Sequence, residues 1–436
     1  MKKYARYKDS GISWIGEVPE HWDVVPFRSE FSLGKGLPIT KDNLINDEIN
    51  GVPVVSYGQI HSKENEGTVL KRNLLRFVES SWLDSNPQSL LRKNDIVFAD
   101  TSEDLDGCGN CVLNTETRKI FAGYHTIIAF TNKEENGPFY AYLFQSDIWR
   151  SQIRTRVNGV KVYSVTRTHL KRCKLLLPPL SEQKAIAEYL DKKIAQINEL
   201  VSAKQKQIEL LKEYKQSIIA NAVTGKIDER REKRKWKDSG ISWIGKIPEN
   251  WEVDKLGHRF IQRKEKVSDK DYPPLSVSKM GVTPQLESAC KTDDGDNRKL
   301  VLKGDFVVNS RSDRKGSCGL SELDGSVSLI NIVATPRNID GHYIHYLFRS
   351  NNYIEEFYRM GRGIVADLWT TRWSEMRTIM IPVPPLSEQK EIVAYIEKKV
   401  FFIDFQIASI ENQIANLNEY KQSLISDVVT GKVKVC

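Results

Sequence analysis

The side chains best suited to catalysis are Glu182 and Lys184, which recur as Glu388 and Lys390 in a second copy of the same segment. Glutamate two positions before lysine is a pattern found in nucleases, but such a site also needs an upstream acidic partner, and none can be placed. The chain contains no phosphate-binding P-loop, no dinucleotide-binding glycine fingerprint and no HExxH zinc motif. Both glutamates are therefore interpreted as first-turn helix residues, where the helix dipole favours negative charge. A self-contained enzyme is not expected.

The six cysteines do not form a metal-binding pattern. Only Cys108 and Cys111 have the two-residue separation of a zinc ligand pair, and a zinc site would need a second such pair. We therefore predict that this chain binds no metal and no cofactor. Free thiols, the lack of a signal peptide and the lack of an apolar run of about 18 residues predict a cytoplasmic protein without a membrane segment.

Nucleic-acid binding is better supported than catalysis. The net charge of +8 permits it, although a charge of that size is also ordinary for a solvated surface. Between Ile148 and Ser181 there is no acidic residue, whereas eight residues are basic. This composition suits contacts with phosphates, and a merely exposed basic face is the alternative. The residues of this segment predicted to bind DNA are Arg154, Arg156, Lys161 and Tyr163.

Base reading is predicted for polar side chains in the loops that follow strands. In the second half, their donors suit the O6 and N7 atoms of guanine. These residues are Ser310, Arg311, Ser312, Arg314 and Lys315, and Ser278 and Lys279 are also predicted to bind DNA. Arg359 and Arg362 stand near the place that corresponds to the basic segment of the first half, where Glu355, Glu356 and Asp367 dilute the positive charge. For base reading in the first half, the corresponding residues are Tyr57, Gln59, His61, Thr101 and Ser102. Asp100 beside them is a candidate acceptor for the cytosine N4 amino group, or a turn cap.

The elements that must position these residues begin with a repeated helix. The segment PPLSEQK…VTGK at 178–226 returns at 384–432, always 206 positions later (181 to 387, 213 to 419). Each copy is predicted to be one long helix with Ser181 as its N-cap, and Gly225 is predicted to end the first one. Apolar residues in the second copy alternate at four- and three-residue spacing from Ile396 onward, which is typical of a coiled-coil seam.

A second repeat precedes each globular segment. KDSGISWIGEVPEHWDV at 8–24 returns as KDSGISWIGKIPENWEV at 237–253, so the chain is a tandem duplication. We predict that each copy forms a folded hook. Its tryptophans would serve as packing anchors, and these are Trp14, Trp22, Trp243 and Trp251.

The globular segments, at 24–177 and 253–383, are predicted to be α+β domains with largely antiparallel sheets. Their predicted strands are Val52–Tyr57, Asp95–Ala99, Thr126–Phe130, Asp305–Asn309 and Ser328–Ala334, and their predicted helices are Phe139–Ile153 and Tyr343–Tyr358. The whole chain divides into a hook with the first domain (1–177), a helix (178–226), a charged linker with the second hook (227–252), the second domain (253–383), and a helix with a tail (384–436).

The order of these parts predicts a geometry. Short connections tie the second domain to the end of the first helix and to the start of the second, so those two helix ends must lie close together. The helices are therefore expected to form an antiparallel coiled coil with a pseudo-two-fold axis. Two similar domains in opposed orientation suit a bipartite site on duplex DNA.

Two K-D-S-G-x-x-W-I-G-x-[VI]-P-x-x-W hooks, each followed by a variable domain and a P-P-L-S-E-Q-K helix ending in V-T-G-K, closely resemble the specificity (S) subunit of type I restriction–modification enzymes. The resemblance covers essentially the whole chain. It implies two target recognition domains, spacer helices in an antiparallel coiled coil, and no catalytic activity in this subunit. It further implies assembly on double-stranded DNA with two methyltransferase subunits and with restriction subunits. Those partners, not this chain, would use S-adenosylmethionine, ATP and magnesium, and the target adenine would be flipped into the methyltransferase.

Two alternatives remain open at the level of sequence. The first is a coiled-coil scaffold whose globular heads bind other proteins, as an anti-restriction or assembly factor would. The second is an intrinsic nuclease built on the glutamate–lysine pairs. Duplex binding that weakens steeply with salt would separate DNA recognition from the scaffold, and metal-dependent cleavage by the chain alone would favour the nuclease.

Overall fold

The computed structural model describes residues 2–65, 67–133, 136–159, 161–227, 234–285, 295–311, 314–363 and 369–435. The chain forms two compact units. Unit 1 contains Met1–Lys204 and Asn412–Cys436, and unit 2 contains Gln205–Glu411. The last residues of the chain therefore fold with the first half, as a chain doubled back on itself requires.

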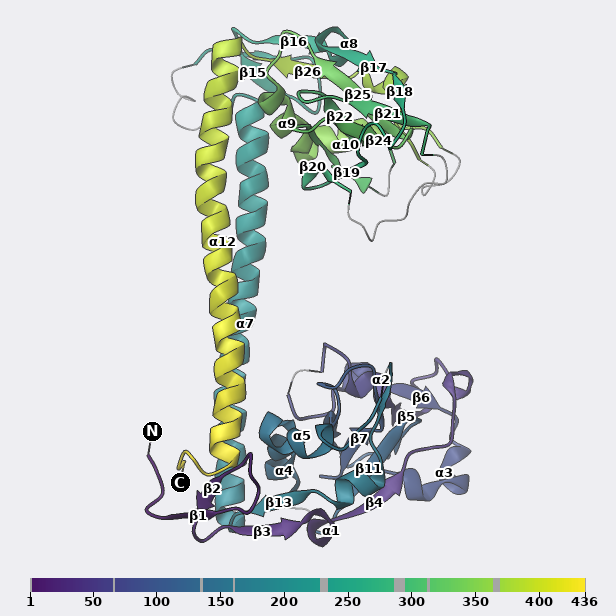
Figure 1. The fold of residues 1–436 in the computed structure, drawn as a ribbon, viewed down its shortest axis with the longest axis vertical. Helices are drawn as coiled ribbons and strands as arrows, with labels where there is room; N and C mark the ends of the chain where they lie inside the picture. Colours follow the sequence, from purple (N-terminus) through teal and green to yellow (C-terminus); the bar gives the residue numbers. More distant parts are fainter. Residues whose placement is uncertain are drawn as a thin grey trace. The chain divides into compact units, whose positions relative to one another are not determined.

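The two long helices are α7 (Leu180–Val223) and α12 (Leu386–Val429), each of 44 residues and drawn in teal and yellow in Figure 1. The prediction of one continuous helix in each repeat is confirmed. The prediction of Ser181 as N-cap is wrong, because the helix begins one residue earlier and the Pro179 carbonyl accepts from the Glu182 amide at 2.9 Å. Gly225 ends α7 with the expected left-handed backbone, at φ 79°.

Within each unit the two helices run antiparallel. In unit 1, Leu190 near the start of α7 shares a core with Val428 near the end of α12. In unit 2, Val223 at the end of α7 shares a core with Ile396 near the start of α12. Lys204, which interrupts the apolar seam, donates from Nζ to the Gln413 side-chain oxygen at 2.5 Å. These contacts confirm the predicted antiparallel coiled coil.

Each unit contains a four-stranded antiparallel sheet of the same topology, which confirms the α+β tandem repeat. In unit 1 the order is β4 (Phe31–Lys35), β11 (Thr126–Thr131), β7 (Ile96–Ala99) and β9 (Cys111–Leu113). In unit 2 it is β17 (Phe260–Arg263), β25 (Asn331–Pro336), β22 (Phe306–Asn309) and β23 (Cys318–Leu320).

The smaller sheets differ between the units. Unit 1 has β10 (Phe121–Ala122) parallel to β5 (Val52–Val55), which pairs on its other side with β6 (Arg76–Val78). Unit 2 has the antiparallel set β18 (Lys266–Val267), β21 (Arg298–Val301) and β24 (Gly325–Val327), and a hairpin of β19 (Leu275–Ser278) with β20 (Gly281–Pro284). The globular segments, whose sequences differ most between the two halves of the chain, thus also differ in the arrangement of their smaller sheets.

The hooks are two-stranded ribbons, β1 (Tyr7–Asp9) with β2 (Glu17–Pro19) and β14 (Trp236–Asp238) with β15 (Lys246–Pro248). The strands that enter and leave each globular domain also pair, β3 (Asp23–Pro26) with β13 (Lys174–Leu177) and β16 (Glu252–Lys255) with β26 (Met380–Val383). Trp22 and Trp251 are fully buried, as anchors should be, whereas Trp14 is 39% exposed and does not act as one.

Both predicted domain helices are broken in two, which the sequence analysis missed. Phe139–Ile153 is instead α4 (Gly137–Gln145) and α5 (Asp147–Arg154), and Tyr343–Tyr358 is α9 (Gly341–Arg349) and α10 (Asn351–Arg359). At each break an extended serine, Ser146 or Ser350, accepts a hydrogen bond from the amide three residues later. Serine competes for backbone donors in this way, so it begins a new helix.

Other boundaries shift by a few residues. The strand predicted to reach Tyr57 ends at Val55, because the Gln59 side chain accepts from the Ser56 amide at 2.9 Å and starts a helix. The strand predicted from Ser328 begins at Asn331, after a turn. The short helices are α1 (Phe27–Glu30), α2 (Tyr57–Ile60), α3 (Trp82–Ser85), α6 (Arg167–Lys171), α8 (Leu256–Arg259) and α11 (Trp373–Met376).

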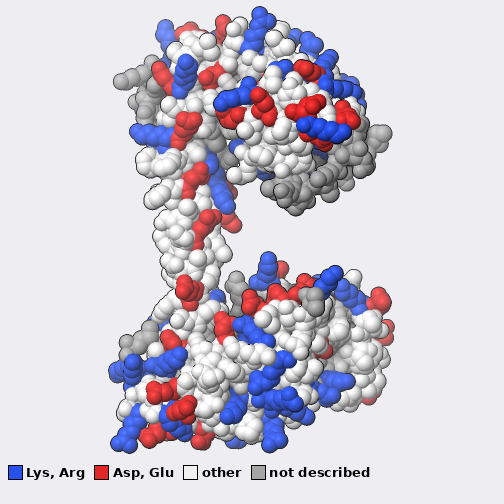
Figure 2. All heavy atoms as spheres, viewed as in Figure 1, with Lys and Arg blue, Asp and Glu red and all other residues white. Residues whose placement is uncertain are grey.

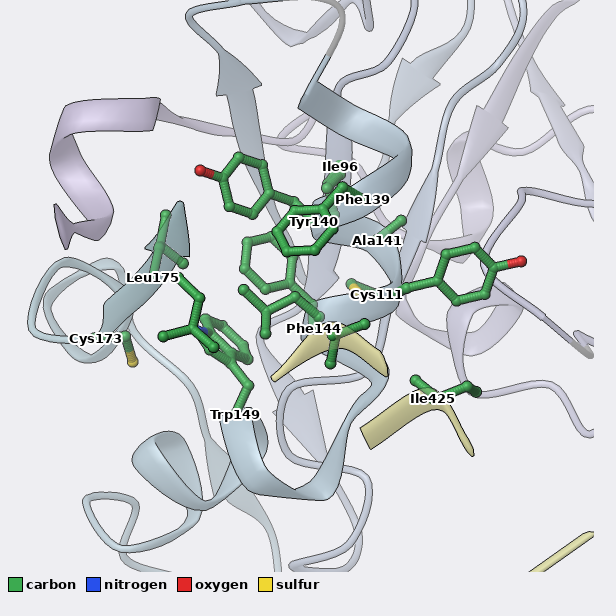
Figure 3. Packing of buried hydrophobic residues seen from close by; sticks show 14 of the residues in the cluster. Ile96, Cys111, Phe139, Tyr140, Ala141, Phe144, Trp149, Cys173, Leu175 and Ile425 are labelled. Carbon is green, nitrogen blue, oxygen red and sulfur yellow. The ribbon is translucent and has the colours of Figure 1, made fainter. Parts of the chain in front are cut away.

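Aromatic side chains dominate the core of unit 1. Figure 3 shows Tyr140 and Phe144 of α4 beside Trp149 of α5, and the Phe144 and Trp149 ring centroids are 4.2 Å apart. Leu175 of β13 and Ile425 of α12 belong to the same cluster. The core therefore joins the globular domain to the coiled coil. Among the described residues, no helix combines the length and apolarity needed to cross a membrane.

Candidate nucleic-acid interface

Glu182, the strongest catalytic candidate, is engaged in holding the hook. Its carboxylate accepts from the Tyr4 hydroxyl at 2.8 Å, the Trp22 indole nitrogen at 3.0 Å and the His21 Nε2 at 2.6 Å. Burial alone would raise its pKa, but these three hydrogen bonds outweigh burial and the pKa is lowered. In the second repeat, Glu388 pairs with Arg234. Across the described ranges, no group of three or more His, Cys, Asp or Glu is placed to hold a metal ion, and the glutamates have a structural role.

The strand-end loops of unit 1 bring together polar residues that are distant in sequence. Strand β8 (Thr101–Ser102) pairs with β12 (Tyr163–Ser164), so Tyr163 lies opposite Ser102. The Val165 amide donates to the Asp100 carbonyl at 2.8 Å, which places α6 next to this loop. A predicted base-reading loop and a predicted phosphate-binding segment therefore form one surface.

Several of the predicted residues on this surface are already hydrogen-bonded within the protein. His61 Nε2 lies 2.8 Å from the Thr101 carbonyl oxygen, and His61 Nδ1 lies 2.9 Å from the side-chain nitrogen of Asn110. Both ring nitrogens are therefore engaged in hydrogen bonds within the protein. Ser102 is buried and donates to the Asp104 carbonyl at 2.8 Å. Tyr57 is half-buried and its ring packs edge-on against His125, with centroids 5.4 Å apart.

The arginines of α5 and its C-terminal turn make contacts within unit 1. Arg154 pairs with Asp147 at 3.0 Å and donates to the Asp106 carbonyl, and its side chain is only 17% exposed. Arg156 donates to the Gln152 carbonyl. Both therefore hold local structure, whereas Lys161 is exposed. On the face of unit 1 drawn in Figure 2, lysine and arginine side chains form several patches.

Unit 2 has an open cleft of about 840 Å³ at the corresponding place. Its lining contains four cations and no acidic residue: Lys264, Lys299, Arg372 and Arg377, with Trp373, Ser310 and Thr370 among the other residues. The Thr371 amide donates to the Ser310 carbonyl at 3.1 Å, just as Val165 does to Asp100 in unit 1. Backbone hydrogen bonds join Thr370 to Arg362, and a β-bridge joins Thr370 to Arg311. The predicted residues Ser310, Arg311 and Arg362 therefore meet at this place.

Four cationic residues of this cleft were missed by sequence reasoning. Arg377 stands 206 positions after Lys171 of the basic segment, so the repeat spacing was a signal that could have found it. Arg372 corresponds to Thr166, Lys264 follows β17 and Lys299 lies on β21, and these three had no such signal. Lys299 is half-buried, which lowers its pKa, and its ammonium donates to the Asn331 carbonyl at 2.6 Å.

The remaining predicted residues of unit 2 lie apart from this cleft. Lys279 and Lys315 line a second hollow of about 580 Å³, and Lys315 pairs with Glu355 at 3.2 Å. Arg359 forms a two-point ion pair with Glu356, at 2.6 and 2.7 Å. The Ser278 hydroxyl accepts from the Met280 amide at 3.0 Å. Arg314 is exposed, and Ser312 lies outside the described residues, as does 228–233 of the charged linker.

Comparisons with known proteins find the same kind of relative along nearly the whole chain. The family model of the type I restriction modification DNA specificity domain matches residues 19–210. A Methanocaldococcus jannaschii protein assigned as the type I restriction enzyme MjaX specificity subunit is 26% identical over 97% of this chain and 96% of its own length. The type I restriction enzyme EcoKI specificity subunit of Escherichia coli K12 is 21% identical over 96% and 90%.

Solved structures share the fold over nearly the whole length. A chain from a structure of a type I R-M system, concerned with complex assembly and conformational transition, has a TM-score of 0.67 at 17% identity and covers 95% of this chain and 99% of its own. The HsdS subunit from Thermoanaerobacter tengcongensis has a TM-score of 0.52 at 16% identity, with 95% and 98% covered. Doubled hooks, doubled helices and these similarities lead to one conclusion: along nearly its whole length the chain is similar to type I restriction enzyme specificity subunits, and residues 19–210 match the DNA specificity domain of that family.

Proposed function

We propose that this chain is the non-catalytic DNA sequence-recognition subunit of a type I restriction–modification complex. One observation carries the proposal: in both units a short helix is hydrogen-bonded through the backbone just before it to the loop at a strand end. The helix of unit 1, α6, contains Arg167 and Lys171, and the helix of unit 2, α11, is flanked by Arg372 and Arg377. Cations beside such a loop suit phosphate contact, and polar loop side chains suit base reading. The names of the relatives support the same function.

The proposed target is a bipartite, asymmetric duplex site. The two globular domains share a sheet topology but differ in their smaller sheets and loop residues, so each would read its own half-site. The helices α7 and α12 would set the number of unread base pairs between the half-sites. In this proposal the recognition domains are 24–177 and 253–383, and the protein acts in the cytoplasm.

The partners are proposed on the same basis. Two methyltransferase subunits would bind the two repeats and would supply S-adenosylmethionine chemistry at adenine N6. Restriction subunits, with ATP and magnesium, would complete the complex. This chain would position the DNA and its partners, and would take no part in bond making.

Replacing residues 24–177 with the corresponding segment of another specificity subunit tests this function. With the partner methyltransferase present, modified adenines should change their sequence context in one half-site only. A change in both half-sites would contradict reading by separate domains. Binding of other proteins without any effect on modification would support the scaffold alternative instead.

A further inference from the structure

His125 occupies an unusual backbone position in the first recognition domain. It precedes β11 and has a φ of 55°, one of three positive values among non-glycine residues in the described ranges. Residues other than glycine uncommonly adopt this conformation, and such strain tends to persist at functional positions. Its side chain is nevertheless 56% exposed, so burial does not account for the conformation.

The neighbouring loop fixes which ring nitrogen of His125 carries a proton. Asp100 Oδ1 lies 3.1 Å from His125 Nδ1 and accepts from the Thr101 hydroxyl at 2.7 Å. Thr101 Oγ1 also lies 3.3 Å from His125 Nδ1, but its hydroxyl proton points to Asp100. An ionised carboxylate can only accept, so a proton on His125 Nδ1 is the arrangement that satisfies all three groups. In the neutral ring, Nε2 then carries a lone pair and is an acceptor.

The ring is also restrained on other sides. The Asp100 amide donates to the His125 carbonyl at 3.1 Å, which ties the two backbones together. The rings of Tyr57 and Tyr124 pack edge-on against His125, with centroid distances of 5.4 and 6.0 Å. A side chain held in one orientation and one tautomer loses little entropy when it binds.

We propose that His125 Nε2 is the acceptor with which the first domain reads an exocyclic amino group, N6 of adenine or N4 of cytosine, in the major groove. Those two amino groups are the donors that the major groove presents. Asp100 is the positioning residue, and the inference rests on the proposed DNA-recognition function. Basic residues of α6, next to the same loop, would contact the adjacent phosphates.

This feature belongs to the first domain alone among the described residues. At the corresponding place in unit 2, the Ser310 hydroxyl donates to the Ile330 carbonyl at 2.6 Å and the cleft lining contains no carboxylate. The effect of His125 should therefore be confined to one half-site. Most other candidate residues supply hydrogen-bond donors, which recognise acceptor atoms on the bases. His125 would instead supply an acceptor, which recognises a donor group on a base.

The experiment measures base preference at every position, using the complex of this chain with its methyltransferase and a randomised duplex library. The test variant is His125→Asn, because asparagine tolerates the left-handed backbone but ends short of the Nε2 position. We expect preference at one position of one half-site to fall about tenfold or more, with the other half-site unchanged. His125→Gln, whose amide oxygen can accept, should restore part of the preference.

Two further arms separate reading from structure. His258→Asn is the matched control, because His258 forms a similar exposed pair with Asp254 at 2.7 Å but lies outside the cleft linings. Replacing the read adenine by purine, or the read cytosine by an analogue without the N4 amino group, should weaken wild-type binding about tenfold and leave His125→Asn binding unchanged. Asp100→Asn should shift the imidazole ¹⁵N resonances of His125 away from the Nδ1–H tautomer and reduce preference at the same position.

The outcomes are distinct. If the wild type reads two half-sites and His125→Asn keeps every base preference, the inference about His125 is wrong and the proposed function stands. If the wild-type complex has no base preference at all, the proposed function itself fails.

Discussion

The carboxylate of Glu182 accepts a hydrogen bond from the indole nitrogen of Trp22 at 3.0 Å, although 160 positions separate the two residues. The same hook reaches the end of the other long helix, because a Cβ added to Gly431 would lie 2.4 Å from the Pro19 ring and 3.2 Å from Trp22. One hook therefore fastens the start of α7 and the end of α12 together. It fixes the antiparallel pairing within unit 1.

Glu182→Gln should loosen this hook. The substitution keeps the shape of the side chain but removes its charge from three donors, and hydrogen bonds to a charged group are each worth about 1.5–3 kcal/mol. Amide hydrogen exchange over residues 4–22 should become faster. Glu388→Gln, the matched change in the second repeat, should leave exchange in that segment unchanged, and equal effects of the two variants would contradict the assignment.

The same contact predicts a pH dependence. Burial raises the pKa of Glu182, but the hydrogen bonds from His21, Trp22 and Tyr4 lower it further than burial raises it. A carboxylate whose pKa is lowered on folding adds stability above its ordinary pKa of 4.5 and loses it as the pH falls through the folded value. Protection of the hook should therefore decline below about pH 4.5 in the wild type. In Glu182→Gln this decline should be much smaller.

Ile396→Ala should destabilise unit 2. The side chain is fully buried between the coiled coil and the domain core, and such truncations cost about 2–5 kcal/mol. Phe401→Ala on the same helix is the control, because Phe401 is 69% exposed. Denaturant unfolding should show a lower midpoint for the first variant only, and a similar loss in both would mean that the exposed face is also packed.

Arg372→Ala and Arg377→Ala should weaken duplex binding by the methyltransferase complex. If each arginine contacts one phosphate, each loss should reduce the slope of log affinity against log salt by about one. Lys303→Ala is the control, because Lys303 is 69% exposed and does not line the cleft. A salt slope that is unchanged in both arginine variants would exclude the cleft as a phosphate-binding site.

Inserting one heptad at matching levels of α7 and α12 should lengthen the spacer. Seven residues keep the apolar seam in phase and add about 10 Å, which corresponds to about three base pairs of duplex. The half-site sequences should stay as they are in the wild type. Mapping the modified positions checks this, and altered half-site letters would contradict a spacer role for the helices.

Sequence reasoning succeeded where the signal is local and periodic. The four–three spacing from Ile396 onward predicts a coiled coil because each turn repeats the same apolar face. It failed at Ser146 and Ser350, because aromatic residues continue on both sides of each break and conceal it. At each of these positions one capping side chain decides whether the helix continues or a new one begins, and the spacing of apolar residues does not reveal this.

The candidate interface could be predicted only in part. Tyr163 and Thr101 were both chosen, but their proximity depends on the pairing of β8 with β12, which sequence does not specify. Lys264, Lys299 and Arg372 meet only because three distant segments fold around one cleft. His125 went unnoticed because its backbone conformation and its contact with Asp100 are properties of the fold.

The most direct test is a genome-wide map of N6-methyladenine in cells that carry this chain and its methyltransferase, compared with cells that carry the methyltransferase alone. The account predicts modified adenines within two short, different half-sites separated by a constant number of unread base pairs, and only when this chain is present. One continuous recognition sequence, or the same modified positions without this chain, would contradict it.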